Sequence, residues 1–440
     1  MYDKNGTKLG YIWLQPGVTR LNGWTLLYVL FISIGLLVFL NFQQPYVLEV
    51  MLGIPESEHG RVIAKMGLVH EVVILSLVGP FGALSDRIGR RPVLAFGYLM
   101  IMAGYLAYPF ATSVLMLTMF RAIFAVGAAA VICTFTTVLT DYPQEMSRGK
   151  LVALGSVLNA FGLAILAGVG GQVISWLTES GFDPVSAGRI AIVGVGLVGL
   201  ISAAIVMIGL RGETLRLEHQ KIPLSTLVKE GFGAARNPRI ALAYASAFIA
   251  RGDNVVLGAY LSLWAQQAGM AMNLSAGDAQ AGAGKLLALI MVAPLPIAAF
   301  FGYINDRVDR VTGMIIASGM GAVGYLAFGS LGSPLVAMAI PVGIVLGSGM
   351  IASVIASQTL IGQEADPKIT GSTLGAFNFF GGVGTIVATV VGGYLFDMWM
   401  SGGPFLMMGF GSAVVFVFAI FVRTRYGLAE PPRSGAVIAA

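Results

Sequence analysis

Long apolar runs alternate with short polar segments along almost the whole chain. Each run is about 20 residues or longer, the length at which an α-helix crosses a hydrocarbon layer about 30 Å thick. Lipid offers no hydrogen-bond partners, so the backbone of such a segment must be satisfied within the segment. The pattern predicts an all-α membrane protein with twelve transmembrane helices, at residues 24–46, 63–85, 93–111, 113–138, 152–177, 190–210, 239–265, 283–304, 311–331, 333–357, 372–396 and 403–423.

Composition supports the same class of protein. Of the 440 residues, 57% are hydrophobic and only 11% are charged, whereas an ordinary soluble domain has about 25% charged residues. The segment before the first span contains Lys4, Lys8 and Arg20 but no apolar core of a signal peptide, so we expect the first span to be retained. Cys133 is the only cysteine, which excludes an internal disulfide and a cysteine-rich metal site.

The basic residues predict the orientation of the chain. If the N-terminus is cytoplasmic, 20 of the 26 Lys and Arg residues lie on the cytoplasmic side, as the positive-inside rule requires. We therefore expect both termini in the cytoplasm and a location in the inner or plasma membrane. The basic residues are spread over many connecting segments and form no single stripe, so we expect no nucleic-acid partner despite the sequence pI of 9.3.

The second half of the chain repeats features of the first. At an offset of 220 residues, GALSDR from Gly82 falls on GYINDR from Gly302. Arg90 likewise falls on Arg310, Gly127 on Gly347, and Leu154-Gly155 on Leu374-Gly375. Internal repeats of this kind are typical of transporters. We expect an N-terminal six-helix bundle at 1–210, a cytoplasmic linker at 211–238 and a C-terminal six-helix bundle at 239–440.

The connection between the second and third spans, GALSDRIGRRP, resembles the signature of the major facilitator superfamily, G-x-L-[AS]-D-R-x-G-R-[RK]. Its fixed positions are occupied by Gly82, Leu84, Asp86, Arg87, Gly89, Arg90 and Arg91. The second copy keeps Asp306 and Arg307 but has Asp309 in place of the second glycine. The resemblance implies two pseudo-symmetric bundles that transport by alternating access, with no enzyme activity and no cofactor.

Asp86 is the residue of this motif that a simple turn does not explain. A turn on the cytoplasmic side accounts for the arginines, and Gly89 permits a positive φ. An acid at the end of a membrane span is costly unless it has a partner. The resemblance implies that Asp86 faces the start of the eleventh span, GSTLG at 371–375, and that an arginine of the turn pairs with Asp141. We expect a conformational latch; the alternative is a device for topology alone.

Charged residues inside the fourth and second spans are candidates for proton coupling. Arg121 lies about a third of the way into the fourth span and resembles a second motif of the superfamily, which is associated with proton coupling. His70 and Glu71 reach a similar depth, as do Asn41 and Gln44 of the first span. Glu71 is the nearest counter-charge by depth. A Glu71–Arg121 pair is either structural, or part of a site where Glu71 or His70 exchanges a proton.

The seventh span contains a second pair of charges, Arg251 and Asp253. Two positions on a helix differ by about 200°, so their side chains cannot share a face, and Gly252 between them would permit a break in the helix. We expect one of them to contact substrate or a cavity network, with a structural pair between spans as the alternative. The candidate cavity residues are Asn41, Gln44, Arg251, Asp253 and Asn254.

Together these features predict a proton-coupled secondary transporter that moves a small organic solute, as in the efflux of a drug or metabolite. Two arginines in one cavity would instead favour uptake or exchange of an organic anion. A multidrug antiporter is disfavoured because Leu166-Ala167 stands where the fifth span of those proteins has Gly-Pro. A sensor or channel on the same scaffold is the interpretation from another class. We expect the partners to be a small-molecule substrate, a proton or other coupling ion and the lipid bilayer, and the protein to be a monomer without a metal site.

Overall fold

The structure, a computed structural model, describes residues 6–212, 224–305, 307–366 and 369–427. Its described part contains 12 helical segments that are long and apolar enough to cross a membrane, which confirms the predicted number. The segments are Arg20–Met51, Glu56–Ile88, Arg90–Phe110, Val114–Asp141, Met146–Glu179, Pro184–Gly209, Pro238–Ala271, Ala276–Asn305, Arg310–Gly329, Ala339–Glu364, Ser372–Met398 and Gly403–Tyr426.

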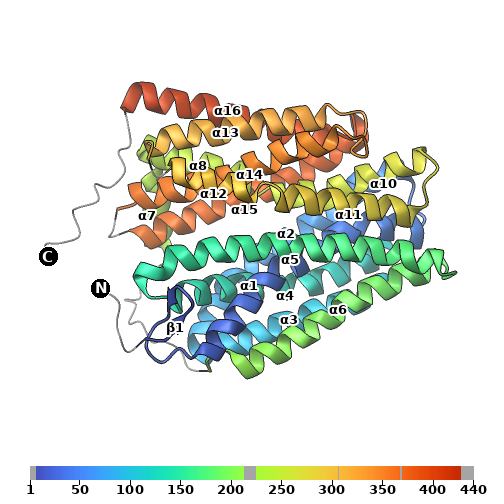
Figure 1. The fold of residues 1–440 in the computed structure, drawn as a ribbon, viewed down its shortest axis with the longest axis horizontal. Helices are drawn as coiled ribbons and strands as arrows, with labels where there is room; N and C mark the ends of the chain where they lie inside the picture. The colour runs from blue at the N-terminus through green and yellow to red at the C-terminus, as the bar shows by residue number, and fades with distance from the viewer. Residues whose placement is uncertain (1–5, 213–223, 306, 367–368, 428–440) are drawn as a thin grey trace, which may run out of the picture. The chain divides into compact units, whose positions relative to one another are not determined.

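The chain divides into two compact units (Figure 1). The first unit comprises residues 1–218 and 261–288, and the second comprises 219–260 and 289–440. Helices of the first unit are α1 (Arg20–Tyr46), α2 (His59–Ile88), α3 (Arg90–Ala107), α4 (Val114–Asp141), α5 (Glu145–Glu179), α6 (Pro184–Gly209), α10 (Leu261–Ala271) and most of α11 (Ala276–Val292). Helices of the second unit are α7 (Leu224–Gly233), α8 (Pro238–Ala250), α9 (Asp253–Val255), α12 (Leu295–Asn305), α13 (Arg310–Gly329), α14 (Ala339–Glu364), α15 (Thr370–Met398) and α16 (Gly403–Tyr426).

Polar contacts attach α10 and α11 to the first unit. The Ser262 hydroxyl donates to the Phe42 carbonyl at 2.6 Å, and Nε2 of Gln280 donates to the same oxygen at 2.8 Å. The Ser175 hydroxyl of α5 donates to Asp278 at 2.7 Å. The compact units therefore do not follow the order of the spans along the chain, and the six-plus-six grouping at 1–210 and 239–440 stays a prediction.

Glycines of α5 allow the close helix packing that its small residues predict. A Cβ added at Gly162 would lie 1.6 Å from the carbonyl oxygen of Phe31 on α1, so only glycine fits there. The same contact recurs in the second unit, where a Cβ at Gly384 would lie 1.7 Å from the carbonyl oxygen of Phe248. Both units therefore use glycine to bring two helix backbones together.

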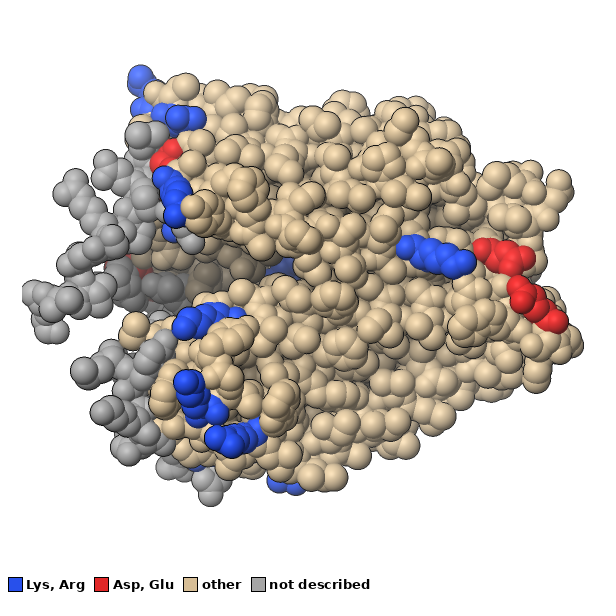
Figure 2. Space-filling view, in the orientation of Figure 1, with Lys and Arg blue, Asp and Glu red and all other residues tan. Residues whose placement is uncertain are grey.

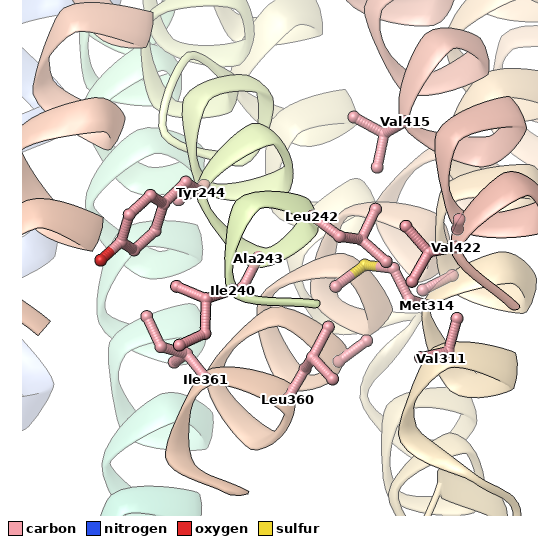
Figure 3. Close-up of a cluster of buried hydrophobic side chains, with 14 of the residues drawn as sticks. Ile240, Leu242, Ala243, Tyr244, Val311, Met314, Leu360, Ile361, Val415 and Val422 are labelled. Atoms are coloured by element: carbon pink, nitrogen blue, oxygen red, sulfur yellow. The ribbon is translucent and has the colours of Figure 1, made fainter. Parts of the chain in front are cut away.

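A buried apolar cluster holds the second unit together (Figure 3). It joins side chains of α8, α13, α14 and α16, among them Leu242, Met314, Leu360 and Val422. Tyr244 of α8 extends the cluster toward α7 and α15, because its hydroxyl donates to the carbonyls of Gly231 at 2.8 Å and Thr373 at 3.2 Å.

The predicted linker at 211–238 is partly helical, which the sequence analysis missed. Its residues 224–233 form α7, and the ring of Phe232 contacts Phe379 and Phe380 of α15 with centroids 5.4 Å away in each case. Residues 213–223 of that linker lie outside the described residues.

A short hairpin before the first span was also missed. Strands β1 (Lys8–Leu9) and β2 (Ile12–Trp13) pair antiparallel. The segment that follows bonds to the connection between α4 and α5, where the Gln15 amide donates to the Tyr142 carbonyl at 2.8 Å. Strands of two residues are too short to leave a periodic pattern in the sequence.

The seventh and eighth spans are broken. Helix α8 ends at Ala250, a turn at Arg251 and Gly252 follows, and a π-helical turn at Val256–Tyr260 separates α9 from α10. The expected break at Gly252 is therefore confirmed. The eighth span is interrupted between α11 and α12 beside Pro294, whose ring removes a backbone donor. Unit boundaries fall at 260/261 and 288/289, at or near these breaks.

Two predictions about the tenth span are wrong in detail. It runs from Ala339 to Glu364 and not over 333–357, because Ser333 and Pro334 form a turn in which the Leu335 amide donates to the Ser333 hydroxyl at 3.2 Å. The second wrong prediction is the pairing of Gly127 with Gly347: by its packing contacts, Gly349 is the counterpart of Gly127. A Cβ at Gly127 would lie 2.7 Å from the amide nitrogen of Ile101, and one at Gly349 would lie 2.4 Å from that of Gly321.

Most exposed charges lie near the ends of the spans; Arg251, well inside the seventh span, is an exception. On the face shown in Figure 2, a wide band between the two ends carries almost no charged side chain. This distribution is the one that a lipid-facing surface requires, since a charge exposed to hydrocarbon is costly.

Replacing Gly162 with alanine should destabilise the fold. The added Cβ meets a backbone carbonyl that cannot rotate away, so we expect a loss of about 3 kcal/mol in the free energy of unfolding, at the upper end of overpacking effects. Thermal unfolding of the purified protein measures the change, and size-exclusion chromatography after heating gives the folded fraction at each temperature. Gly194→Ala is the control, because a Cβ there meets no atom within 4 Å. Equal melting temperatures for the two variants would contradict the packing argument.

Candidate functional site

The signature motif forms a one-residue connection between α2 and α3. Gly89 separates the two helices and has φ of +100°, which confirms the expected positive φ. A Cβ at this position would lie 2.9 Å from the Gly212 carbonyl oxygen. Gly82, about two turns earlier, faces the fourth span, where a Cβ would lie 3.3 Å from the Cys133 sulfur. Close approach thus favours glycine at both positions.

Arg90 is the centre of the motif's polar contacts. Its guanidinium donates to Asp86, to the Ser85 hydroxyl at 3.2 Å and to Asp141 of α4 at 3.5 Å. The Asp86 side chain is 67% exposed, whereas those of Arg90 and Asp141 are 15% and 17% exposed. The exposed Arg90–Asp86 pair joins α2 to α3 and is worth little, whereas the less exposed Arg90–Asp141 contact joins α3 to α4. The arginine pairing that the resemblance implies is thus present, with Arg90 as the arginine.

The other arginines of the motif differ in their surroundings. Arg87 is exposed. Arg91 lies beside Gly212, where an added Cβ would be 3.8 Å from Nη1 of Arg91. Whether Asp86 meets the start of the eleventh span concerns the second unit, and that contact stays a prediction.

The second copy of the motif has a different local role. Asp309, which replaces the glycine, caps α13 by accepting from the amides of Val311 and Thr312 at 3.1 Å. Nη1 of Arg310 donates to the Asn305 carbonyl at 2.5 Å, and the Arg307 guanidinium lies over the Tyr303 ring. Asp306 lies outside the described residues. A helix cap explains why an acid stands at the position of the glycine.

Arg121 is buried in the first unit with little of its hydrogen-bonding capacity used. The residue is 1% exposed, and its Nη2 donates to the amide oxygen of Asn41 on α1. Nε and Nη1 are buried and make no hydrogen bond among the residues that the structure describes. Glu71 acts on Arg121 through its charge. The expected counter-charge is therefore near, but the hydrogen bond is made to Asn41, because depth along two helices does not fix which way each side chain points.

Aromatic side chains join His70 to Arg121. The Phe124 ring stacks on the His70 ring with centroids 5.7 Å apart, and the Arg121 guanidinium lies 5.5 Å from the Phe124 centroid. Nδ1 of His70 and the Tyr108 hydroxyl are also buried, with no hydrogen bond inside the described ranges. The sequence analysis missed Phe124 and Tyr108. Phe124 follows Arg121 by three positions, so helical spacing alone was a usable signal.

Gln44, the other cavity candidate of the first unit, has a different neighbour. Gln44 is buried, and its amide nitrogen lies 3.3 Å from the Met66 sulfur. Asn254 is exposed on α9. Depth in the span therefore selected Asn41 correctly as a neighbour of Arg121 but did not separate it from Gln44.

Arg251 and Asp253 face different helices of the second unit, as their spacing predicts. Nη2 of Arg251 donates to the Asn378 amide oxygen of α15 at 2.5 Å. Asp253 is 3% exposed and accepts from the Tyr325 hydroxyl of α13 at 2.5 Å. Over the described ranges, no group of three or more His, Cys, Asp and Glu side chains is placed to hold a metal ion.

Comparison with known proteins identifies the family. The sequence profile described as Major Facilitator Superfamily matches residues 69–388 and 274–438. The chain belongs to the Major Facilitator Superfamily. It is therefore an integral, multi-pass membrane protein of a family of secondary transporters.

Similar proteins include magnetosome proteins of two bacteria. The magnetosome protein MamZ of Magnetospirillum gryphiswaldense is 27% identical over 91% of this chain, which spans 62% of that protein's length. The magnetosome protein MamH of Paramagnetospirillum magneticum is 28% identical over 87% of this chain and 88% of its own. Among solved structures, a mutant of the nucleoside transporter NupG superposes with a TM-score of 0.69 at 14% identity, covering 90% of this chain and 98% of NupG. That likeness shows a common fold.

Removing the Arg90 side chain should impair transport more than removing that of Arg87. In Arg90→Ala the contact to Asp141 is lost and a less exposed acid is left without this partner, so we expect a loss of stability of about 1–3 kcal/mol and slower turnover. Arg87→Ala removes the same charge from the same turn without breaking a described contact. Thermal unfolding and initial transport rates in proteoliposomes measure both effects. Equal losses in the two variants would refute a specific role for Arg90.

Arg121→Met should separate stability from function. Arg121 makes one hydrogen bond to a described side chain, so an apolar side chain of similar length should cost less stability than the loss of an arginine that is hydrogen-bonded to an acid, while transport should fall to background. Arg239→Met is the control, because Arg239 donates to Glu364 at 3.2 Å and its removal takes this cationic partner from that acid. Thermal unfolding should show Arg239→Met as the less stable of the two variants. The opposite order would mean that Arg121 is a structural residue.

Proposed function

We propose that this transporter moves a small organic anion whose negatively charged group binds to Arg121. The observation that carries the proposal is the buried guanidinium whose Nε and Nη1 make no hydrogen bond among the described residues. Buried arginines are normally paired, because an unsatisfied charge in a low-dielectric interior is costly. A carboxylate or phosphate from outside the protein would compensate this charge and accept hydrogen bonds from the guanidinium.

Side chains around Arg121 suit a small substrate with an apolar or aromatic part. Phe124 lies against both Arg121 and His70 and offers a ring face. The Tyr108 hydroxyl is a further buried group with no hydrogen bond within the described residues. A polar contact at one end and an aromatic surface beside it are the usual composition of a small-molecule site.

Proton coupling at Glu71 and His70 follows from the same arrangement. When a substrate anion binds at Arg121, the positive charge that stabilises ionised Glu71 is shared with a second anion. Proton uptake by Glu71, or by the nearby His70, then becomes more favourable, and by reciprocity the proton favours binding of the anion. Anion and proton would thus move together, so the mode of coupling that we propose is symport.

Efflux of a drug or metabolite by proton antiport is the second candidate. It requires substrate and proton to compete for Glu71, so a neutral or cationic substrate would bind on the acid and not on the arginine.

For the membrane we propose the inner or plasma membrane with both termini in the cytoplasm, on the distribution of 20 of 26 basic residues. The names of the two magnetosome proteins support a magnetosome membrane as the alternative.

A ligand screen followed by transport with Glu71→Gln tests both candidates. We expect organic anions, and not cationic drugs, to raise the melting temperature of the purified protein, and Arg121→Met to abolish this shift. Uptake of the best ligand into proteoliposomes should rise about tenfold or more with an inwardly directed proton gradient, and Glu71→Gln should remove that dependence while exchange of the ligand continues. Stabilisation by cations alone, or an unchanged gradient dependence, would refute the proposal.

A further inference from the structure

A small polar cavity lies next to Asp253 inside the second unit, whereas Arg121 belongs to the first unit. Asp253, Tyr325 and Gly321 line it together with the hydroxyls of Ser246, Ser318, Ser353 and Ser412. Its interior has about the room of one water molecule. The cavity is thus too small for an organic solute but large enough for a small ion.

The charge of Asp253 has no cationic partner in the wall of this cavity. Asp253 and Tyr325 are its titratable side chains, and its other described lining residues are apolar or carry hydroxyls. The Tyr325 hydroxyl donates one hydrogen bond to Asp253, which orients the carboxyl group but leaves its charge uncompensated. A carboxyl group that is 3% exposed is therefore neutralised either by a bound cation or by a proton.

The serine hydroxyls offer oxygen atoms to such a cation. Those of Ser246, Ser353 and Ser412 line the cavity together with Asp253. The Ser318 hydroxyl donates to the Met314 carbonyl at 2.6 Å, so the lone pairs of its oxygen can still coordinate a cation. Carboxylate and hydroxyl oxygens are the ligands that hard cations prefer.

The corresponding place in the first unit carries hydroxyls but no acid. At the offset of 220, Ser33 matches Asp253 and Tyr98 matches Ser318, and their hydroxyl oxygens are 2.7 Å apart. There the Tyr105 hydroxyl, which matches that of Tyr325, donates at 2.5 Å to the backbone carbonyl of Leu36, and Leu36 is fully buried. Ile101, whose amide lies against Gly127, matches Gly321, whose amide lies against Gly349. Ile101 is also fully buried. The fold thus packs well at this place without an acid and without a glycine, so folding alone does not explain Asp253 and Gly321.

We propose that Asp253, Tyr325 and the surrounding serine hydroxyls form a binding site for Na⁺. One monovalent cation neutralises one carboxylate, whereas a divalent ion would leave an excess buried charge. Na⁺ is favoured over K⁺ because it takes fewer oxygen ligands, and the described wall of the cavity offers one carboxylate and a few hydroxyls. The site lies at the broken part of the seventh span, where α8 ends, and transporters use broken helices to bind ions. The site is independent of the substrate at Arg121.

Thermal unfolding of the purified full chain in NaCl, KCl and choline chloride, at equal ionic strength and pH, tests this site. We expect the melting temperature to rise with Na⁺ concentration and to saturate, and to stay unchanged in the other two salts. Asp253→Asn should abolish the rise. Equilibrium binding of radioactive Na⁺ should give one ion per chain, and excess K⁺ should not displace it.

Gly321→Ala keeps the test valid if Asp253→Asn does not fold. The added Cβ would lie 3.5 Å from the Ser412 hydroxyl and 3.7 Å from that of Ser353, so the protein should accept it while the cavity is filled. We expect an apparent Kd for Na⁺ about tenfold higher or more. Gly362→Ala, where an added Cβ meets no atom within 4 Å, is the matched control and should bind Na⁺ like the unaltered protein.

Three results would overturn the proposal. The first is an equal response to Na⁺, K⁺ and choline. The second is a Na⁺ response that persists in both Asp253→Asn and Gly321→Ala. The third is stabilisation by acid at constant salt without any response to Na⁺, which would mean that Asp253 is neutralised by a proton and that no cation site exists.

Discussion

The cost of burying charge in a membrane governs this protein. A charged side chain surrounded by helices and lipid must find a partner of opposite charge, a set of hydrogen bonds, or a ligand. Arg90 meets this requirement through Asp86, Ser85 and Asp141. Arg121 meets it only in part, through Asn41 and the charge of Glu71. Groups that are fully satisfied hold helices together, and groups that are not are available for ligands.

Close backbone contact is the second constraint, and it is what places these groups. Gly162 and Gly384 let helices approach until a carbonyl oxygen fills the space of a side chain. Once the backbones touch, the side chains beside them have few positions left. Asn41 can then reach Arg121 from α1, and Tyr325 can reach Asp253 from α13. The small residues that pack the helices thus also set the geometry of the polar contacts.

The two units show how one architecture can be adapted to different tasks. Tyr105 and Tyr325 occupy matching places, yet one donates to a backbone carbonyl and the other to a carboxylate. Ile101 fills the space that Gly321 leaves open. The first unit instead places its unsatisfied groups on Arg121, His70 and Tyr108. Two chemically different candidate sites, one for an anion and one for a cation, have thus arisen on repeats of the same fold.

The sequence by itself determined the twelve spans, the family, the positive φ of Gly89 and the opposite directions of Arg251 and Asp253. These depend on length, local spacing and backbone sterics, which are properties of neighbouring residues. The partners of Arg121 and Asp253, the helix at 224–233 and the shifted start of the tenth span were decided only by the tertiary structure. Depth along a helix can be counted in residues, but the direction of a side chain around the helix axis depends on which helix packs beside it. That is why the charged residues could be found in the sequence and their partners could not.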